Sequence, residues 1–198
     1  MTIFGPDLES TGTNPFSDEI ITIQYRDSET SATHVYKRWE YENERDLIFA
    51  FLMDWKDIRW HRKSGGPLRV GYRVTDFDLP FLVVRCYETG VFEKLRAGPD
   101  FVWSNLAHGP SYLDLAQLLG ADMVPFEAWR DELLGTSSPA DGSEMVELYE
   151  QGNYEEIEEY VNDEMKTLER LYDEIQSTEY FQELLDMRQN IGFERELR

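Results

Sequence analysis

Strand-prone segments dominate the first part of the chain and helix-prone segments dominate its last part, and this order constrains the possible fold more than any other feature. Two runs rich in β-branched and aromatic residues, 19–26 and 33–41, flank a polar turn at 27–31 and predict a hairpin. Strands are predicted at 2–4, 19–26, 33–41, 68–74 and 111–115. Strands mixed with helices and then followed by helices predict an α/β domain with a helical C-terminal end.

Apolar residues at helical spacing predict the helices of this domain. They are expected at 42–55, 78–87 and 116–134, and turns or loops at 7–15, 63–67 and 135–143, where Gly, Pro, Asn and Ser gather. The longest apolar stripe, at steps of three and four, runs through Ile157, Val161, Met165, Leu168, Tyr172 and Ile175. With 198 residues, the chain suits one domain, predicted at 1–176, followed by a helical extension at 177–198.

The chain is strongly acidic, with 40 Asp and Glu residues against 19 Lys and Arg and a net charge of -21. This balance argues against a protein that holds nucleic acid through bulk positive charge. Arginines outnumber lysines 14 to five, and few lysines on an acidic surface are what we expect of a halophile, where salt screens self-repulsion. An ordinary acidic protein is the alternative.

Cysteine content and hydropathy indicate where in the cell the protein is expected. Cys86 is the only cysteine, which excludes an intrachain disulfide and a multi-thiolate zinc site. The longest wholly apolar run, 47–53, is far shorter than the roughly 18 residues of a membrane span. The N-terminal residues have no basic or apolar segment typical of a signal peptide. We therefore expect a cytoplasmic protein that does not enter a membrane.

Carboxylates occur at three separated places where a metal enzyme would need them. On an extended strand, Asp7 and Glu9 would point to one face and could hold the same cation. Asp78 stands where a strand gives way to a helix, and it could instead cap that helix, with Asp76 as the competing cap or ligand. Each residue could also be plain acidic surface.

The third place lies in the last helix, where Tyr160 and Glu164 are one turn apart and flank the apolar stripe. The alternative interpretation is a solvated acidic helix face, because four glutamates lie just upstream.

Together, the three motifs resemble the DEDD superfamily of 3'-5' exonucleases, which have an RNase H-like fold, and most of all the proofreading exonuclease of family B DNA polymerases. The motifs are DLESTGTNPFSDEIITIQ, GYRVTDFDLPFL and YVNDEM, within a resemblance that runs from Thr2 to Tyr172. It implies an α/β fold with a mixed β-sheet flanked by helices. The implied activity is phosphodiester hydrolysis at the 3' ends of single-stranded DNA.

The resemblance also implies a two-metal mechanism with Mg²⁺ or Mn²⁺. The metal ligands would be Asp7, Glu9, Asp78 and Glu164, and the catalytic set would add Tyr160. A His or a Tyr orients the attacking water in this superfamily. None of the three histidines lies near the third motif, so Tyr160 takes this role and the chain falls in the Tyr-type branch. DNA replication or repair proteins are the implied partners.

Three departures from the family pattern are present. Arg73 occupies the position of the usual Asn, and Gly5 and Pro6 separate the strand from Asp7. The third-motif acid is Glu164, whereas a shift by one residue would restore an Asp, Asp163. These departures keep a rival open, a non-catalytic RNase H-like module that binds a partner through its acidic surface. An RNase or endonuclease of the same fold, the choice of DNA or RNA, and the oligomeric state also stay open.

Overall fold

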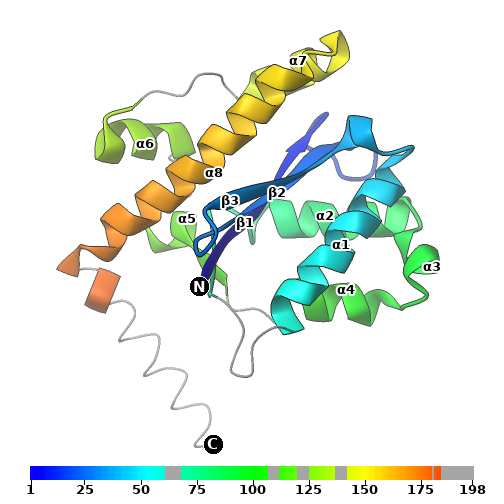
Figure 1. The fold of residues 1–198 in the computed structure, drawn as a ribbon, viewed down its shortest axis with the longest axis horizontal. Coiled ribbons are helices and arrows are strands. Elements are labelled where there is room, and N and C mark those ends of the chain that lie inside the picture. Colours follow the sequence, from blue (N-terminus) through cyan, green and yellow to red (C-terminus); the bar gives the residue numbers. More distant parts are fainter. Residues whose placement is uncertain (61–67, 107–111, 120–124, 137–141, 180, 184–198) are drawn as a thin grey trace, which may run out of the picture.

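The structure, a computed structural model, describes residues 1–60, 68–106, 112–119, 125–136, 142–179 and 181–183 (Figure 1). Five strands form one mixed sheet in the order β3-β2-β1-β4-β5. The strands are β1 (Thr2–Ser10), β2 (Ile20–Asp27), β3 (Ala32–Lys37), β4 (Leu68–Gly71) and β5 (Tyr112–Asp114). The β1–β2 and β2–β3 pairs are antiparallel, whereas β4 lies parallel to β1 and β5 parallel to β4. This confirms the expected RNase H-like α/β fold.

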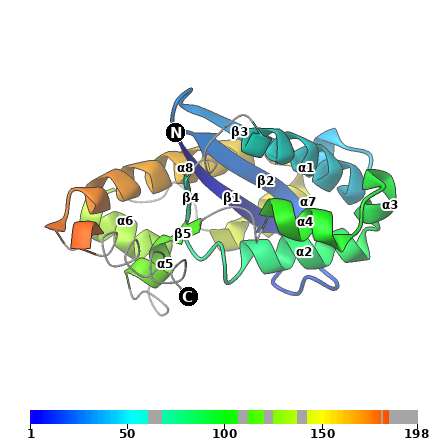
Figure 2. The ribbon, with the colours of Figure 1, turned by 90° about the horizontal axis from the view of Figure 1, so that it is seen from below.

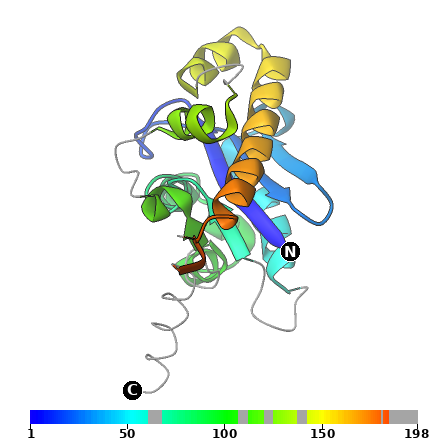
Figure 3. The same ribbon diagram turned by 90° about the vertical axis from the view of Figure 1, so that its left-hand side faces the viewer.

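Helices cover both faces of the sheet (Figure 2). On one side lie α1 (Glu44–Trp60), α2 (Asp78–Glu88), α3 (Val91–Leu95) and α4 (Pro99–Leu106). On the other lie α5 (Leu115–Leu118), α6 (Phe126–Leu134), α7 (Met145–Gln151) and the long α8 (Tyr154–Gln176), which runs along the sheet in Figure 3. Two short 3₁₀ turns, Arg38–Glu40 and Gly142–Glu144, complete the described elements.

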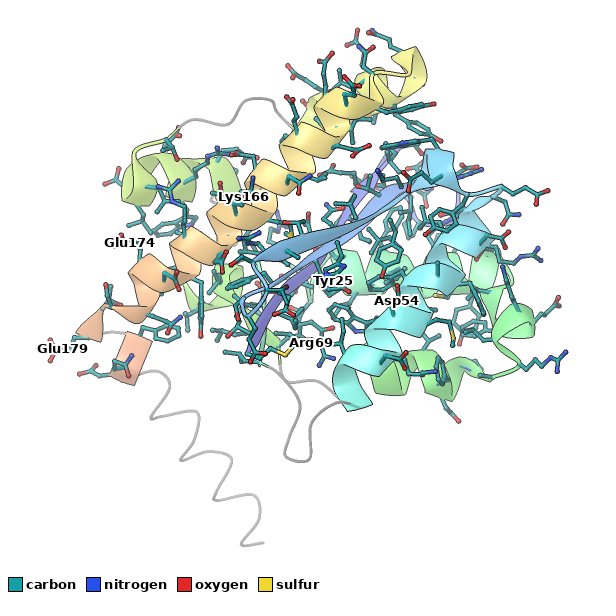
Figure 4. The ribbon with its side chains drawn as sticks, viewed as in Figure 1. Tyr25, Asp54, Arg69, Lys166, Glu174 and Glu179 are labelled. Atoms are coloured by element: carbon teal, nitrogen blue, oxygen red, sulfur yellow. The ribbon has the colours of Figure 1, made fainter. Side chains whose placement is uncertain are left out.

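Each face of the sheet has its own apolar core. Between the sheet and α1, an aromatic cluster includes Tyr25, whose ring is 5.4 Å from that of Trp55. Figure 4 labels Tyr25 and Asp54 in this layer, where Tyr36 donates a hydrogen bond to Asp54. Under α8, the predicted stripe is buried, while Lys166 and Glu174 of the same helix are exposed.

Several predicted boundaries are wrong. The turn expected at 7–15 begins only after Ser10, because residues 7–10 belong to β1. The predicted strands at 33–41 and 68–74 end at Lys37 and Gly71, and the helix predicted at 42–55 runs on to Trp60. The helix expected at 116–134 appears as α5 and α6. Residues 120–124 between them, the loop predicted at 63–67, and residues 137–141 of the loop predicted at 135–143 lie outside the described residues.

A β-bulge at Gly5 and Pro6 explains how β1 continues past two residues that usually end strands. The register shifts between Phe4 and Asp7, and the Gly5–Pro6 peptide bond is cis. Gly5 has φ +105°, and a Cβ there would lie 2.9 Å from the carbonyl oxygen of Gln24, so only glycine fits. Beyond the bulge, Asp7 lies opposite Gln24 in β2. Bulges of this kind re-aim side chains next to functional sites.

The end of the described chain packs against the domain. Phe181 is buried, with its ring 5.8 Å from that of Tyr172 in α8. The boundary predicted after residue 176 coincides with the end of α8, and a separate extension stays a prediction. Within the described residues, no helix is both long and apolar enough to cross a membrane.

Candidate active site

The residues predicted from the three motifs come from three elements of the fold. Asp7 and Glu9 lie on the central strand β1, Asp78 is the first residue of α2, and Tyr160 and Glu164 lie on α8. Because α8 packs across β1 and α2 begins beside the same strand, these distant segments meet at one place. The fold therefore brings all five side chains to the lining of one cleft.

Three of the carboxylates surround a common point. Asp7, Glu9 and Glu164 each have an oxygen atom within 4.8 Å of the corresponding oxygens of the other two. Asp78 is tethered beside them, because the backbone N–H of Leu8 donates a hydrogen bond of 3.2 Å to its Oδ1. Asp78 therefore ties the start of α2 to β1.

Burial and mutual repulsion raise the pKa values of these acids. Desolvation raises the pKa of Glu9, and the charges of Glu164, Asp7 and Asp78 raise it further. The pKa values of Asp78 and Glu164 are likewise raised by burial and by Asp7. Burial also raises the pKa of Asp7, although a hydrogen bond from Gln24 opposes this shift. Ionisation of these carboxyls is therefore opposed both by desolvation and by the charges of their neighbours, an unfavourable balance that a bound cation would reverse.

Glu164, and not Asp163, belongs to this cluster. Asp163 turns away and accepts a hydrogen bond of 2.6 Å from the guanidinium of Arg130 in α6. Glu164 faces the other acids, and its Oε2 has no hydrogen-bond partner among the described residues. The positions of these two neighbours on α8 direct Asp163 to α6 and Glu164 to the other acids. The sequence motif alone left open which of the two belongs to the site.

Tyr160 is buried beside the acids. Burial and the charges of Glu164 and Glu9 raise the pKa of Tyr160, so its hydroxyl stays protonated at neutral pH. Its hydrogen bond to Glu164 lowers the pKa of that carboxyl, against the stronger effect of burial. A Cβ at Gly142 would lie only 3.2 Å from the Tyr160 hydroxyl oxygen, so the glycine leaves room for it.

Sequence reasoning missed four residues around the cluster. Gln24 is fully buried on β2, and its Nε2 donates a hydrogen bond of 2.6 Å to Asp7 Oδ2. An amide within an apolar strand was a usable clue. Glu127 of α6 adds to the negative field at Glu9 and Glu164, and Arg130 opposes it. Asp114 anchors the β4–α2 turn, and no sequence pattern pointed to these last three.

An open cleft of about 480 Å³ gives solvent access to the acids. Its floor includes Asp7, Glu9, Asp78 and Glu164, and its walls come from the turn after β1 and from the β4–α2 turn. A cleft of this kind can admit an extended chain, and its floor offers oxygen ligands suited to a hard divalent cation.

The chain shares its fold with a part of a family B DNA polymerase. The solved structure of the enzyme from the hyperthermophilic archaeon Pyrobaculum calidifontis superposes with a TM-score of 0.67 at 17% sequence identity. The similarity covers 88% of this chain but only 24% of the polymerase chain, so this chain corresponds to about a quarter of that protein. No protein-family model and no curated protein sequence matches the chain.

Proposed function

We propose that the protein is a metal-dependent 3'-5' exonuclease that hydrolyses the terminal phosphodiester bonds of single-stranded DNA. One observation carries this proposal: Asp7, Glu9 and Glu164, from opposite parts of the chain, bring oxygen atoms within 4.8 Å of one another on the floor of an open cleft. Similarity to a DNA polymerase supports nucleic acid as the substrate. Replication or repair proteins would be its partners.

The side chains suit hard divalent cations, and we propose that they hold two. All the donors are carboxylate oxygens, which suit Mg²⁺ or Mn²⁺ rather than softer metals. One of them, Glu164 Oε2, is buried without a hydrogen-bond partner among the described residues. Asp7, Glu9, Asp78 and Glu164 would hold the ions. When bound, the ions would activate water for attack and stabilise the leaving 3' oxygen.

The remaining side chains have supporting roles in this proposal. The protonated Tyr160 hydroxyl would donate a hydrogen bond that orients the attacking water, since its raised pKa makes it a poor base. The amide of Gln24 would fix the orientation of the Asp7 carboxylate. The open cleft would leave a path by which the 3' end of a single strand reaches the acids.

The decisive experiment follows a 5'-labelled single-stranded oligonucleotide in Mg²⁺ or Mn²⁺, at low and at molar salt. We expect a ladder of products that shorten from the 3' end, and a loss of rate of at least about a hundredfold for Asp7→Asn, which removes a ligand charge. Asp76→Asn is the matched control, because Asp76 lines the same cleft but lies outside the carboxylate group. A wild-type protein that trims no substrate with any divalent ion contradicts the proposal.

The same assay separates the rival functions. A 3'-labelled strand, a circular strand and an RNA strand distinguish an exonuclease on DNA from an endonuclease or an RNase. A non-catalytic module would cleave none of them. Stabilisation by Mn²⁺ without cleavage would therefore identify a binding module that keeps the metal site.

A further inference from the structure

Arg73 introduces a positive charge into a cleft that is otherwise acidic. It lies in the turn between β4 and α2, is exposed, and lines the cleft together with the acids. Among the described residues that line this cleft, it is the sole Lys, Arg or His. The acids that share the cleft with it are Asp7, Glu9, Asp76, Asp78 and Glu164.

The turn holds Arg73 in a conformation that its side chain does not favour. Its φ is +58°, in the left-handed region that Gly and Asn adopt more readily than Arg. The buried carboxylate of Asp114 fixes this turn by accepting hydrogen bonds from the backbone N–H groups of Arg73 and Thr75, at 2.9 and 3.0 Å. Local backbone preference therefore does not account for an arginine at this position.

No intramolecular ion pair accounts for it either. Among the described residues, no carboxylate lies within 4.0 Å of the Arg73 guanidinium, although five acids line the same cleft. Other arginines of the chain behave differently: Arg85 and Arg130 are buried and paired with Glu44 and Asp163. The guanidinium of Arg73 is thus free to meet an anion from outside the chain.

We propose that Arg73 binds a phosphate of the nucleic-acid strand and sets the affinity of the cleft for its substrate. This inference rests on the proposed function and extends it to a specificity-determining residue. A phosphodiester entering this cleft is repelled by its five acids, and Arg73 is the one cationic side chain among the described lining residues that attracts it. A guanidinium donates two parallel hydrogen bonds to a phosphate, which fixes its position as well as its charge.

The first test compares Arg73→Asn with Arg96→Asn. Arg96 is the matched control because it is also exposed and left-handed, with φ +50°, but it lies at the end of α3 and does not line the cleft. Asn suits this backbone conformation, so both variants should fold. Binding of a labelled single strand is measured by anisotropy in Ca²⁺, after a gel has shown that no product forms.

For Arg73→Asn we expect binding that is about ten- to a hundredfold weaker, as for loss of a hydrogen-bonded charge. The slope of log affinity against log salt should become shallower by about 0.7. In the trimming assay KM should rise by a similar factor, with kcat changed by less than about twofold. Arg96→Asn should match the wild type, and Arg73→Lys should recover only part of the affinity.

A second test identifies the phosphate itself. Oligonucleotides with a single uncharged methylphosphonate linkage, placed in turn at each of the last few positions, are bound to wild type and Arg73→Asn. At one linkage the two proteins should bind equally, because the arginine has lost its partner. An equal difference at every linkage would overturn a specific contact.

The outcomes separate this inference from the proposed function. If the wild type trims DNA and Arg73→Asn binds and trims as well as the wild type, the role of Arg73 is overturned and the exonuclease stands. If the wild type neither binds nor trims a strand, both are overturned.

Discussion

The carboxylate of Asp7 owes its orientation to one buried amide. Gln24 Nε2 holds Asp7 Oδ2 at 2.6 Å, while Gln24 Oε1 has no hydrogen-bond partner among the described residues. A buried acceptor without a partner costs free energy, so Gln24 is not optimal for the stability of the sheet. Its presence at this buried position is explained if it positions a metal ligand.

We therefore expect Gln24→Leu to weaken Mn²⁺ binding by about ten- to a hundredfold while leaving the free energy of unfolding nearly unchanged. Titration calorimetry and chemical denaturation measure the two quantities. Thr22→Val is the control, because Thr22 is equally buried on the same strand, opposite Glu9, and its hydroxyl also has no partner among the described residues. Equal Mn²⁺ affinity in Gln24→Leu and wild type would show that Gln24 does not position Asp7 for metal binding.

The pH dependence of stability follows from the raised pKa of Glu9. Its pKa in the unfolded chain is about 4.3, so between this value and the higher folded value the folded state holds more protons. The stabilising contribution is therefore complete below about pH 4 and is lost as the pH rises through the folded pKa. Without metal, the wild type should lose stability relative to Glu9→Gln as the pH rises above about 4.

Thermal melting in a chelator, across pH and at fixed high salt, measures this difference. Mn²⁺ should restore the melting temperature of the wild type but not that of Glu9→Gln. Glu179→Gln is the control, since Glu179 is exposed and lies outside the carboxylate group. A pH profile of Glu9→Gln that parallels that of the wild type would show that this carboxyl is not desolvated.

At the scale of elements, the packing of α6 on α8 decides which acid enters the site. Arg130 is buried on α6 and binds Asp163, so the face of α8 that carries Asp163 packs against α6. The next residue, Glu164, is then directed to β1. Which of the two acids faces the site therefore depends on a contact between two segments that are distant in sequence.

Asp163→Asn and Glu164→Gln should have opposite effects. Asp163→Asn removes the partner of a buried guanidinium and should cost about 1–3 kcal/mol of stability, with Mn²⁺ affinity unchanged. Glu164→Gln should abolish most of the Mn²⁺-dependent rise in melting temperature without a loss of stability in the metal-free protein. Denaturation with and without Mn²⁺ distinguishes them, and a reversed pattern would assign the metal to Asp163.

Elements whose formation depends on nearby residues were predicted from the sequence, whereas elements that depend on contacts with distant residues were not. The stripe in 157–175 predicted α8, because a helix that buries one face has apolar residues at steps of three and four along the sequence. The Gly, Thr, Asn and Pro residues of 7–15 led to a turn prediction that began too early, since the continuation of β1 to Ser10 depends on pairing with β2. The short α3 and α4 were not predicted, and the Arg130–Asp163 contact has no local trace in the sequence.

For the whole molecule, the net charge of -21 is far larger than the four carboxylates of the candidate site account for. Repulsion among the remaining acids destabilises the compact state when the Debye length is about 10 Å, and it is largely screened at 1 M salt, where that length is about 3 Å. Stability and DNA trimming should therefore both persist, or rise, from 0.1 M to molar KCl.

The melting temperature as a function of KCl measures this effect. A variant with Gln at the exposed Glu93, Glu155 and Glu179 should show a smaller rise with salt, because fewer acids repel one another. A melting temperature that falls between 0.1 M and 1 M KCl would contradict adaptation of the acidic surface to salt.

The carboxylates of the candidate site come from β1, from the start of α2 and from α8, and β1 and α8 are separated by more than 140 residues of sequence. Synthesis proceeds from the N-terminus, so β1 leaves the ribosome long before α8 does. Until α8 has emerged and docked, the growing polypeptide has only part of its ligand set. A nuclease of the proposed kind could not cut RNA or DNA before α8 had docked on β1, because its metal site would lack Glu164 until then.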